Sequence, residues 1–211
     1  LAELKAQGLD QNTLVIFTSD NGGAHYIGLD DLNKPYRGWK ATFFEGGTRV
    51  PFFMQLPGVI APGSQFTAPV SHFDIFATSA ALAGVQPPAD RVIDGVNLIP
   101  FARGEQGGRP HEQMFWRSGA YQVARSGDWK LQVNETQDKV WLFNLQDDPT
   151  EQHNLVDAEP ARVKELLAQL AEFNSQQKAP LWPSLVEAPI LIDKPLNRPQ
   201  TIDDEFIYWS N

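Results

Sequence analysis

Two adjacent side chains that could bind a metal ion, Asp20 and Asn21, follow an apolar run at Thr13–Phe17 and precede two glycines. A carboxylate and an amide oxygen are hard ligands, which suit Ca²⁺ or Mg²⁺ better than softer metals. Gly22 and Gly23 would let the backbone turn sharply beside an ion. The alternative is a simple Asx-turn, because Asp-Asn-Gly is a common turn sequence that needs no metal.

The elements around this pair are typical of an α/β fold. The run Thr13–Phe17 is typical of a strand buried on both faces, as in a parallel sheet covered by helices. Leu1, Leu4 and Leu9 precede it near helical spacing, and helix then strand is half of an α/β unit. Since open α/β sheets place ligand sites at the carboxyl ends of their strands, the acid and amide at 20–21 would occupy such a place.

Composition limits the classes of function. The 211 residues are 42% hydrophobic and 20% charged, which indicates a folded globular chain. The formal charge of −9 makes a nucleic-acid partner unexpected, since phosphate backbones would be repelled. The absence of cysteine excludes disulfides, thiolate zinc sites and cysteine nucleophiles. No apolar run reaches the roughly 18 residues of a membrane helix. Because Leu1 stands inside a helical pattern, we expect a piece of a longer polypeptide.

The middle of the chain combines a long loop with regular elements. Residues 22–49 are rich in glycine and polar groups and are typical of a functional loop. The sequence VPFFMQLPG then predicts a strand that ends at a Pro-Gly turn. In SHFDIFATSAALAG, Ser71 and Asp74 form a capping-box pattern with Asp in place of Glu, and Gly84 marks the helix end.

Beyond about residue 105 the pattern predicts a small antiparallel sheet with one helix. AYQVARSGDWKLQV predicts two strands around a turn at Ser126 and Gly127, and KVWLFNL predicts a third. EPARVKELLAQLAEF predicts a surface helix with an apolar stripe, formed by Val163, Leu166, Leu167 and Leu170. The proline-rich residues 180–211 lack periodicity and predict an extended tail lying on the surface.

Two segments together resemble a known family. The sequence SDNGG, followed by RGWKATFFEGGTRVP, is similar to the C-terminal half of the sulfatases, which belong to the alkaline-phosphatase superfamily and hydrolyse sulfate esters. The resemblance implies an α/β fold with a mixed sheet and helices, and a small C-terminal antiparallel β-sheet packed with one helix. Residues 1–104 would then belong to the catalytic domain, 105–179 to the small subdomain and 180–211 to the tail.

The resemblance implies roles for three residues. Asp20 and Asn21 match the later pair of ligands to the family's divalent cation, Ca²⁺ or Mg²⁺. Lys40 matches the lysine that contacts a sulfate oxygen, where an ammonium would neutralise charge during S–O cleavage. A solvated surface lysine is the alternative for Lys40, since most lysines are exposed.

Other residues near these motifs have more open assignments. Glu45 and Arg49 are expected to pair across the Gly46–Gly47 turn and to hold the loop. Arg37 could bind substrate or brace the same loop. His25 could reach the rim of the site and touch substrate, although a lone loop histidine is more often solvated. His72 is a candidate for a capping residue. His111 and His153 have no supporting pattern.

Half of a sulfatase site is missing from these residues. The family's nucleophile is a formylglycine made from the Cys or Ser of a Cys/Ser-x-Pro/Ala-x-Arg motif, and no such motif occurs here. The acidic pair in LDDLN follows a glycine loop rather than an apolar strand, so it does not replace the early metal-binding acids. We expect formylglycine and those acids in a missing N-terminal half, and we expect this piece alone to be inactive.

Three readings of function follow. The first is a sulfuric ester hydrolase acting on a sulfated small molecule or carbohydrate, periplasmic or secreted by family resemblance. The second is a phosphonate or phosphate monoester hydrolase of the same superfamily. Asn21 argues against its two-metal members, because a phosphate dianion with two cations calls for more ligand charge. The third is a non-catalytic binding module, which would explain the absent nucleophile.

Overall fold

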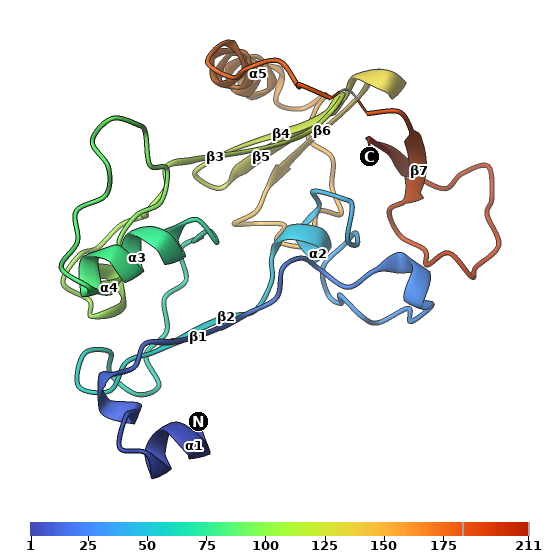
Figure 1. Ribbon diagram of the computed structural model, residues 1–211. Coiled ribbons are helices and arrows are strands. Elements are labelled where there is room, and N and C mark those ends of the chain that lie inside the picture. The colour runs from blue at the N-terminus through green and yellow to red at the C-terminus, as the bar shows by residue number, and fades with distance from the viewer. Residues whose placement is uncertain (183, 211) are drawn as a thin grey trace. The chain divides into compact units, whose positions relative to one another are not determined.

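The computed structural model describes residues 1–182 and 184–210, and contacts divide them into two compact units (Figure 1). The first unit comprises Leu1–Thr18 and Phe52–Glu112, and the second comprises Ser19–Pro51 and the residues from Gln113 onward. Among these residues no helix is both long enough and apolar enough to cross a bilayer. The domain boundaries expected after residues 104 and 179 stay a prediction.

The first unit holds four helical segments and one strand pair among the described residues. Its elements in chain order are α1 (Ala2–Ala6), the 3-10 helix η1 (Asp10–Asn12), β1 (Val15–Thr18), β2 (Phe52–Gln55), α3 (Asp74–Leu82) and α4 (Ile99–Ala102). The predicted helix before the first strand and the predicted strand before the Pro-Gly turn are therefore both present.

The parallel pairing expected for β1 is wrong in this structure. β1 pairs with β2 in antiparallel register, with Val15 opposite Gln55 and Thr18 opposite Phe52. Phe17 is 67% exposed, so the strand is not buried on both faces. A continuous apolar run carries no information about the direction of its neighbour, which is why the sequence alone could not settle the pairing.

Helix α3 is anchored by one buried acid. The backbone N–H of Ser71 donates to Asp74 Oδ2 at 2.7 Å. This is one of the two hydrogen bonds of a capping box, the one in which the acid three residues later accepts the N–H. The same carboxylate accepts the N–H of Val96 at 2.8 Å and contacts His111 Nε2 at 2.8 Å. Gly84 follows the helix with φ +69°, as its predicted end position requires. His111 thus holds α3 to its unit.

The second unit is built on a four-stranded sheet. Its elements in chain order are η2 (His25–Ile27), α2 (Glu45–Thr48), β3 (Gln113–Ser118), β4 (Tyr121–Ser126), β5 (Trp129–Asn134), η3 (Glu135–Gln137), β6 (Lys139–Asn144), α5 (Pro160–Ser175), β7 (Glu187–Leu191) and β8 (Phe206–Ser210). The sheet has the order β3-β4-β5-β6 and every neighbouring pair is antiparallel. The three predicted strands and their antiparallel pairing are confirmed, and β3 is an additional strand.

The two faces of this sheet have different coverings, because successive side chains of a strand point to opposite faces. One face packs against α5, where Leu131 and Leu142 meet Leu166 and Leu170. Figure 1 shows α5 lying across the sheet. The other face packs its aromatic residues against the α2 loop and the β7–β8 pair. That cluster contains Phe43, Phe44, Tyr121, Val123, Trp141, Phe143, Leu145, Ile190, Ile192 and Ile207.

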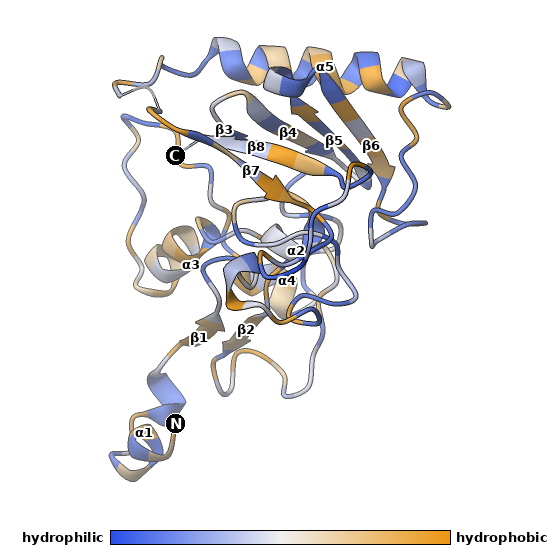
Figure 2. Cartoon of the chain, turned by 90° about the vertical axis from the view of Figure 1, so that its right-hand side faces the viewer, coloured by the Kyte–Doolittle hydropathy of each residue, from blue (hydrophilic) through white to orange (hydrophobic). Residues whose placement is uncertain are grey.

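The expected extended tail is instead a strand pair. β7 and β8 are antiparallel, with Ile190 opposite Ile207, and both isoleucines are buried (Figure 2). Pro189 lies within β7, which pairs on one side only among the described residues, so its missing N–H is tolerated. Pro189 interrupts the alternation of β7, whereas β8 contains no proline and its five residues FIYWS form too short a pattern to have been assigned. Residues 183 and 211 of the predicted tail lie outside the described residues.

The packing of α5 allows a matched test. Leu166 is fully buried and Leu167 is 39% exposed on the same helix. We expect Leu166→Ala to lower the free energy of unfolding by about 2–5 kcal/mol, because it removes core contacts and leaves a cavity. Leu167→Ala should cost clearly less. Urea unfolding followed by circular dichroism measures both, and equal losses would contradict the assigned face of α5.

Candidate active site

The two segments singled out by sequence are joined backbone to backbone. The N–H of Gly22 donates to the carbonyl of Gly47 at 3.0 Å, and the N–H of Lys40 donates to the carbonyl of Gly23 at 3.0 Å. The loop with Asp20 and the loop with Lys40 are therefore neighbours in one unit, although about twenty residues separate them. The structure thus places the backbones of the two motifs side by side, and their assignment to one active site stays a prediction.

Glycine is required where these loops meet. A Cβ on Gly22 would lie 1.7 Å from the carbonyl oxygen of Gly46. A Cβ on Gly46 would lie 2.4 Å from the carbonyl oxygen of Gly38, and one on Gly47 would lie 2.1 Å from that of Thr42. Each of these contacts is with backbone, which cannot rotate away as a side chain can. The glycines of both motifs thus permit close approach of the loops.

Asn33 fastens the same junction, and the sequence analysis gave it no role. Its side-chain oxygen accepts the N–H of Gly23 at 2.7 Å, and its amide nitrogen donates to the carbonyls of Gly23 and Gly38 at 3.0 Å each. The side chain thereby satisfies backbone groups on both loops. The only signal was an amide inside LDDLN, a segment considered only for its acids, so this contact required the tertiary structure.

The side chains at 20 and 21 are free to serve as ligands. Asp20 is exposed and has no hydrogen-bond or ion-pair partner among the described residues. The amide nitrogen of Asn21 donates to the carbonyl of Gly22 at 2.8 Å, which leaves its oxygen as the available atom. Two oxygen donors fit a hard divalent cation. Over 1–182 and 184–210 no cluster of three or more His, Asp or Glu could hold a metal, and a ligand role for Asp20 and Asn21 stays a prediction.

Lys40 extends from a backbone that is held in an unusual conformation. The next residue, Ala41, has φ +71°, in the left-handed region that costs a non-glycine residue free energy. Thr42 is buried; its hydroxyl donates to the carbonyl of Trp39 at 2.9 Å and accepts the N–H of the same residue at 3.0 Å. The Lys40 side chain itself is exposed and has no partner among the described residues. A rigid backbone therefore presents an unpaired ammonium.

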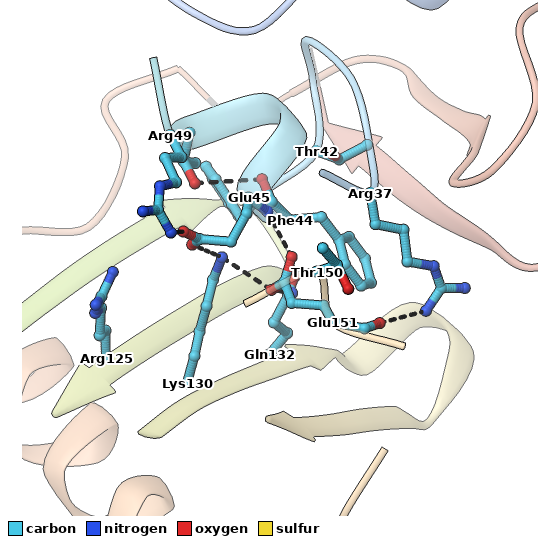
Figure 3. Close-up of polar contacts among 12 residues, drawn as sticks. Arg37, Thr42, Phe44, Glu45, Arg49, Arg125, Lys130, Gln132, Thr150 and Glu151 are labelled. Atoms are coloured by element: carbon cyan, nitrogen blue, oxygen red, sulfur yellow. Dashed lines mark hydrogen bonds and ion pairs between the residues drawn. The ribbon is translucent and has the colours of Figure 1, made fainter. Parts of the chain in front are cut away.

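A buried polar network supports this loop from the sheet (Figure 3). Lys130 on β5 is fully buried, and its ammonium lies 2.8 Å from Glu45 Oε1 and 3.0 Å from Glu151 Oε1. Glu151 Oε2 accepts the N–H of Glu45 at 2.5 Å, and its Oε1 accepts Gln132 Nε2 at 3.0 Å. The first turn of α2 is thus held to the four-stranded sheet by charge-assisted contacts.

Burial and the Lys130 ammonium shift the pKa values of Glu45 and Glu151 in opposite directions. Burial alone would raise the pKa of Glu45, but Lys130, assisted by Arg125 and Arg49, outweighs burial and lowers it. Burial raises the pKa of Glu151, and the neighbouring charge of Glu45 adds to the rise. The network therefore holds an ionised Glu45 opposite Lys130.

The other charged residues near the two motifs have defined surroundings. Arg49 Nη1 lies 3.7 Å from Glu45 Oε2, as expected for the pair across the turn, while Lys130 is the closer partner of that acid. Arg37 contacts Asp193 and the carbonyl of Glu151, which suits bracing. Burial lowers the pKa of His25, whose Nδ1 has no partner among the described residues. A substrate contact by His25 stays a prediction.

Comparison with known proteins relates the chain to one family and its fold to one superfamily. A family model described as Sulfatase matches residues 1–85. The solved structures that resemble the chain have the α/β fold of the alkaline-phosphatase superfamily. These matches support a fragment of a sulfatase-family protein.

The similar proteins are longer than this chain. Steryl-sulfatase of Rattus norvegicus is 41% identical over 156 residues, which cover 71% of this chain and 26% of the relative. The crystal structure of Ps i-CgsB has a TM-score of 0.75 with 29% identity and is covered over 40% of its length; it has also been solved with k-i-k-neocarrahexaose. The phosphonate monoester hydrolase of Agrobacterium radiobacter has a TM-score of 0.63 at 25% identity. The chain thus spans well under half of these proteins.

The glycine contacts predict a large effect of one methyl group. Gly22→Ala would drive its Cβ into the backbone of Gly46, so we expect a loss of about 1–3 kcal/mol or more in unfolding free energy. Gly107 has open space around its Cβ position and serves as the matched control, with Gly107→Ala expected within about 0.5 kcal/mol. Thermal unfolding checks both, and a neutral Gly22→Ala would show that the loops are not in close contact.

The buried ammonium predicts a pH-dependent loss. Lys130→Met leaves two buried carboxylates without their cation, so we expect a loss of about 3–5 kcal/mol at pH 7. The lowered pKa of Glu45 contributes stability above its unfolded pKa, about 4.3, and that contribution disappears as pH falls through the folded pKa. The difference between variant and wild type should therefore shrink below about pH 5.

Urea unfolding at several pH values measures this difference. Lys164→Met, at an exposed position on α5, is the control and should stay within about 0.5 kcal/mol. A Lys130→Met loss that is the same at pH 7 and pH 4 would contradict the electrostatic origin of the effect.

Proposed function

We propose that this chain supplies two metal ligands and one sulfate-binding cation to the active site of a sulfuric ester hydrolase. The observation that carries the proposal is the pair of backbone hydrogen bonds, from Gly22 to Gly47 and from Lys40 to Gly23. They hold the two loops side by side while the side chains of Asp20 and Lys40 remain unpaired among the described residues. Fixed backbone with free functional groups is the arrangement that preorganised catalysis requires.

The residues would act as follows. Asp20 and Asn21 would donate oxygen ligands to a divalent cation, Ca²⁺ or Mg²⁺, and the neutral amide would leave the cation more electrophilic. A bound cation would polarise a sulfate oxygen as a Lewis acid. Lys40 would donate hydrogen bonds to the sulfate group and neutralise charge on it as the S–O bond to the alcohol breaks. The nucleophile, expected to be a formylglycine, would come from a part of the sulfatase outside these 211 residues.

The substrate class is a sulfated carbohydrate or a sulfated small molecule. Support comes from the structurally similar Ps i-CgsB, which has been solved with a neocarrahexaose, and from the similarity to a steryl-sulfatase. The exposed loop that begins at Tyr26 stands beside the proposed site in sequence and would contribute to the surface that meets the alcohol part. A periplasmic or secreted location follows from family resemblance and stays a prediction.

A phosphonate or phosphate monoester hydrolase is the alternative. It is favoured by the fold shared with the phosphonate monoester hydrolase of Agrobacterium radiobacter. The neutral ligand Asn21 favours the sulfate ester, because a sulfate monoester carries one negative charge and needs less cationic compensation than a phosphate dianion. Parallel assays of a sulfate, a phosphate and a phosphonate ester with one complete enzyme separate these readings by their relative kcat/KM.

Lys40→Ala in the complete sulfatase tests the central assignment. We expect kcat for an aryl sulfate to fall by about 10²–10³-fold, as removal of a preorganised electrostatic donor typically does. Lys34→Ala is the matched control, because Lys34 is an exposed lysine of the same loop that pairs with Asp31. Its turnover should be nearly unchanged. Near-normal turnover by Lys40→Ala would overturn the proposed role and favour a non-catalytic module.

A further inference from the structure

Arg37 is a mostly buried cation held by two acids from the segment that connects β7 to β8. Its side chain is 10% exposed, and its Nε and Nη2 donate to the two oxygens of Asp193 at 2.7 Å each. Nη2 also contacts Glu205. Nη1 donates to the carbonyl of Glu151 at 3.2 Å, as Figure 3 shows. The guanidinium carbon lies 5.2 Å from the ring centroid of Phe44. Every nitrogen of the guanidinium is therefore engaged within the protein, which leaves little capacity for substrate.

The two acids stand at the ends of the β7–β8 connection, defined here as residues 192–205. Asp193 follows β7 closely, and Glu205 directly precedes β8. The N–H of Ile192 donates to the carbonyl of Glu205 at 2.9 Å, which places the two ends side by side. Trp141 Nε1 donates to Glu205 at 3.3 Å, and Ile192 is fully buried. The backbone next to both acids is therefore held by packing and hydrogen bonds, which fixes the acids opposite Arg37.

Arg37 is linked in turn to the loop that carries Lys40. Its carbonyl accepts the N–H of Gly46 at 2.7 Å, so the residue bonds to α2 through its backbone and to the β7–β8 connection through its side chain. Gly38 and Ala41, on either side of Lys40, have φ +89° and +71°. Glycine adopts a positive φ readily, but for Ala41 such a conformation persists only where the surrounding structure over-determines it. The Arg37 contacts restrain this backbone on the N-terminal side of Lys40.

We propose that Arg37, held by Asp193 and Glu205, is a positioning residue for Lys40, and that the β7–β8 connection therefore controls the rate of the reaction. This inference rests on the proposed function, since it assigns a task to Lys40. A second set of contacts agrees with it. Arg198 of the same connection pairs with Asp30, and the N–H of Leu196 donates to the carbonyl of His25 at 3.0 Å. The connection thus contacts both loops of the proposed site.

A double-mutant cycle in the complete sulfatase tests the inference. The variants are Asp193→Asn combined with Glu205→Gln, Lys40→Ala, and all three substitutions together. We expect the first variant to lower kcat for an aryl sulfate by about 10–100-fold with KM changed much less, because small misplacement of a catalytic group is costly. In the Lys40→Ala background the same two substitutions should change kcat less than about twofold, since the group they position is absent.

Asp204→Asn is the matched control. Asp204 lies in the same connection and pairs with Lys194 and Thr201 rather than with Arg37, so its substitution should leave kcat within about twofold. Circular dichroism melting reports the folded fraction, to which kcat is normalised. If the double substitution prevents folding, Asp193→Asn alone is taken through the same cycle, because that carboxylate is half-exposed.

Each outcome decides a separate point. An equal fold-loss of kcat with and without Lys40 would overturn the positioning role and leave Arg37 a purely structural residue. An unchanged kcat in the double variant would overturn it as well. If Lys40→Ala by itself retains normal turnover, the proposed function is wrong. This result is separate from a failure of the positioning role, because it does not depend on Asp193 or Glu205.

Discussion

The ammonium of Lys130 is the constraint on which the second unit depends. A fully buried cation is costly unless acids and hydrogen-bond acceptors surround it, so two carboxylates from different segments must converge on it. One comes from α2 and the other from the segment after β6. Their convergence fixes α2 against β5. Because α2 carries the glycines that touch Gly22, a charge on the sheet is linked through one short helix to the loop of Asp20.

The site is rigid in its backbone and open in its side chains. Asn33 and the glycines satisfy the backbone groups where the loops meet, and Thr42 closes the turn beside Lys40. Asp20 and Lys40, by contrast, have no partner among the described residues. A structural ion pair between them would have used up both charges. Under the proposed function, these unpaired side chains on a hydrogen-bonded backbone are the groups that would meet an anionic ester and a cation.

Local pattern predicted the elements that are held by local contacts. The hairpin around Ser126 and Gly127 and the helix that buries Leu166 follow from periodicities of two and 3.6 residues, and both are present. The strands β7 and β8 were missed because Pro189 interrupts the alternation of β7 and because the buried isoleucines of both strands pack against residues from other segments. The direction of the pairing of β1 was missed for a related reason. Which strand pairs with β1, and in which direction, depends on the tertiary structure and not on the residues of β1 alone.

The sequence by itself determined the chemistry available, namely an acid and an amide before two glycines, and a lysine in a glycine-rich loop, all within motifs that resemble the sulfatases. Only the tertiary structure decided how these groups are held. Lys130 meets Glu45 across 85 residues and Arg37 meets Asp193 across 156, distances over which no periodicity carries information. The sequence shows which residue types are present and which local backbone turns they favour. Which residues become partners is decided only in the folded chain, where buried charges must be neutralised.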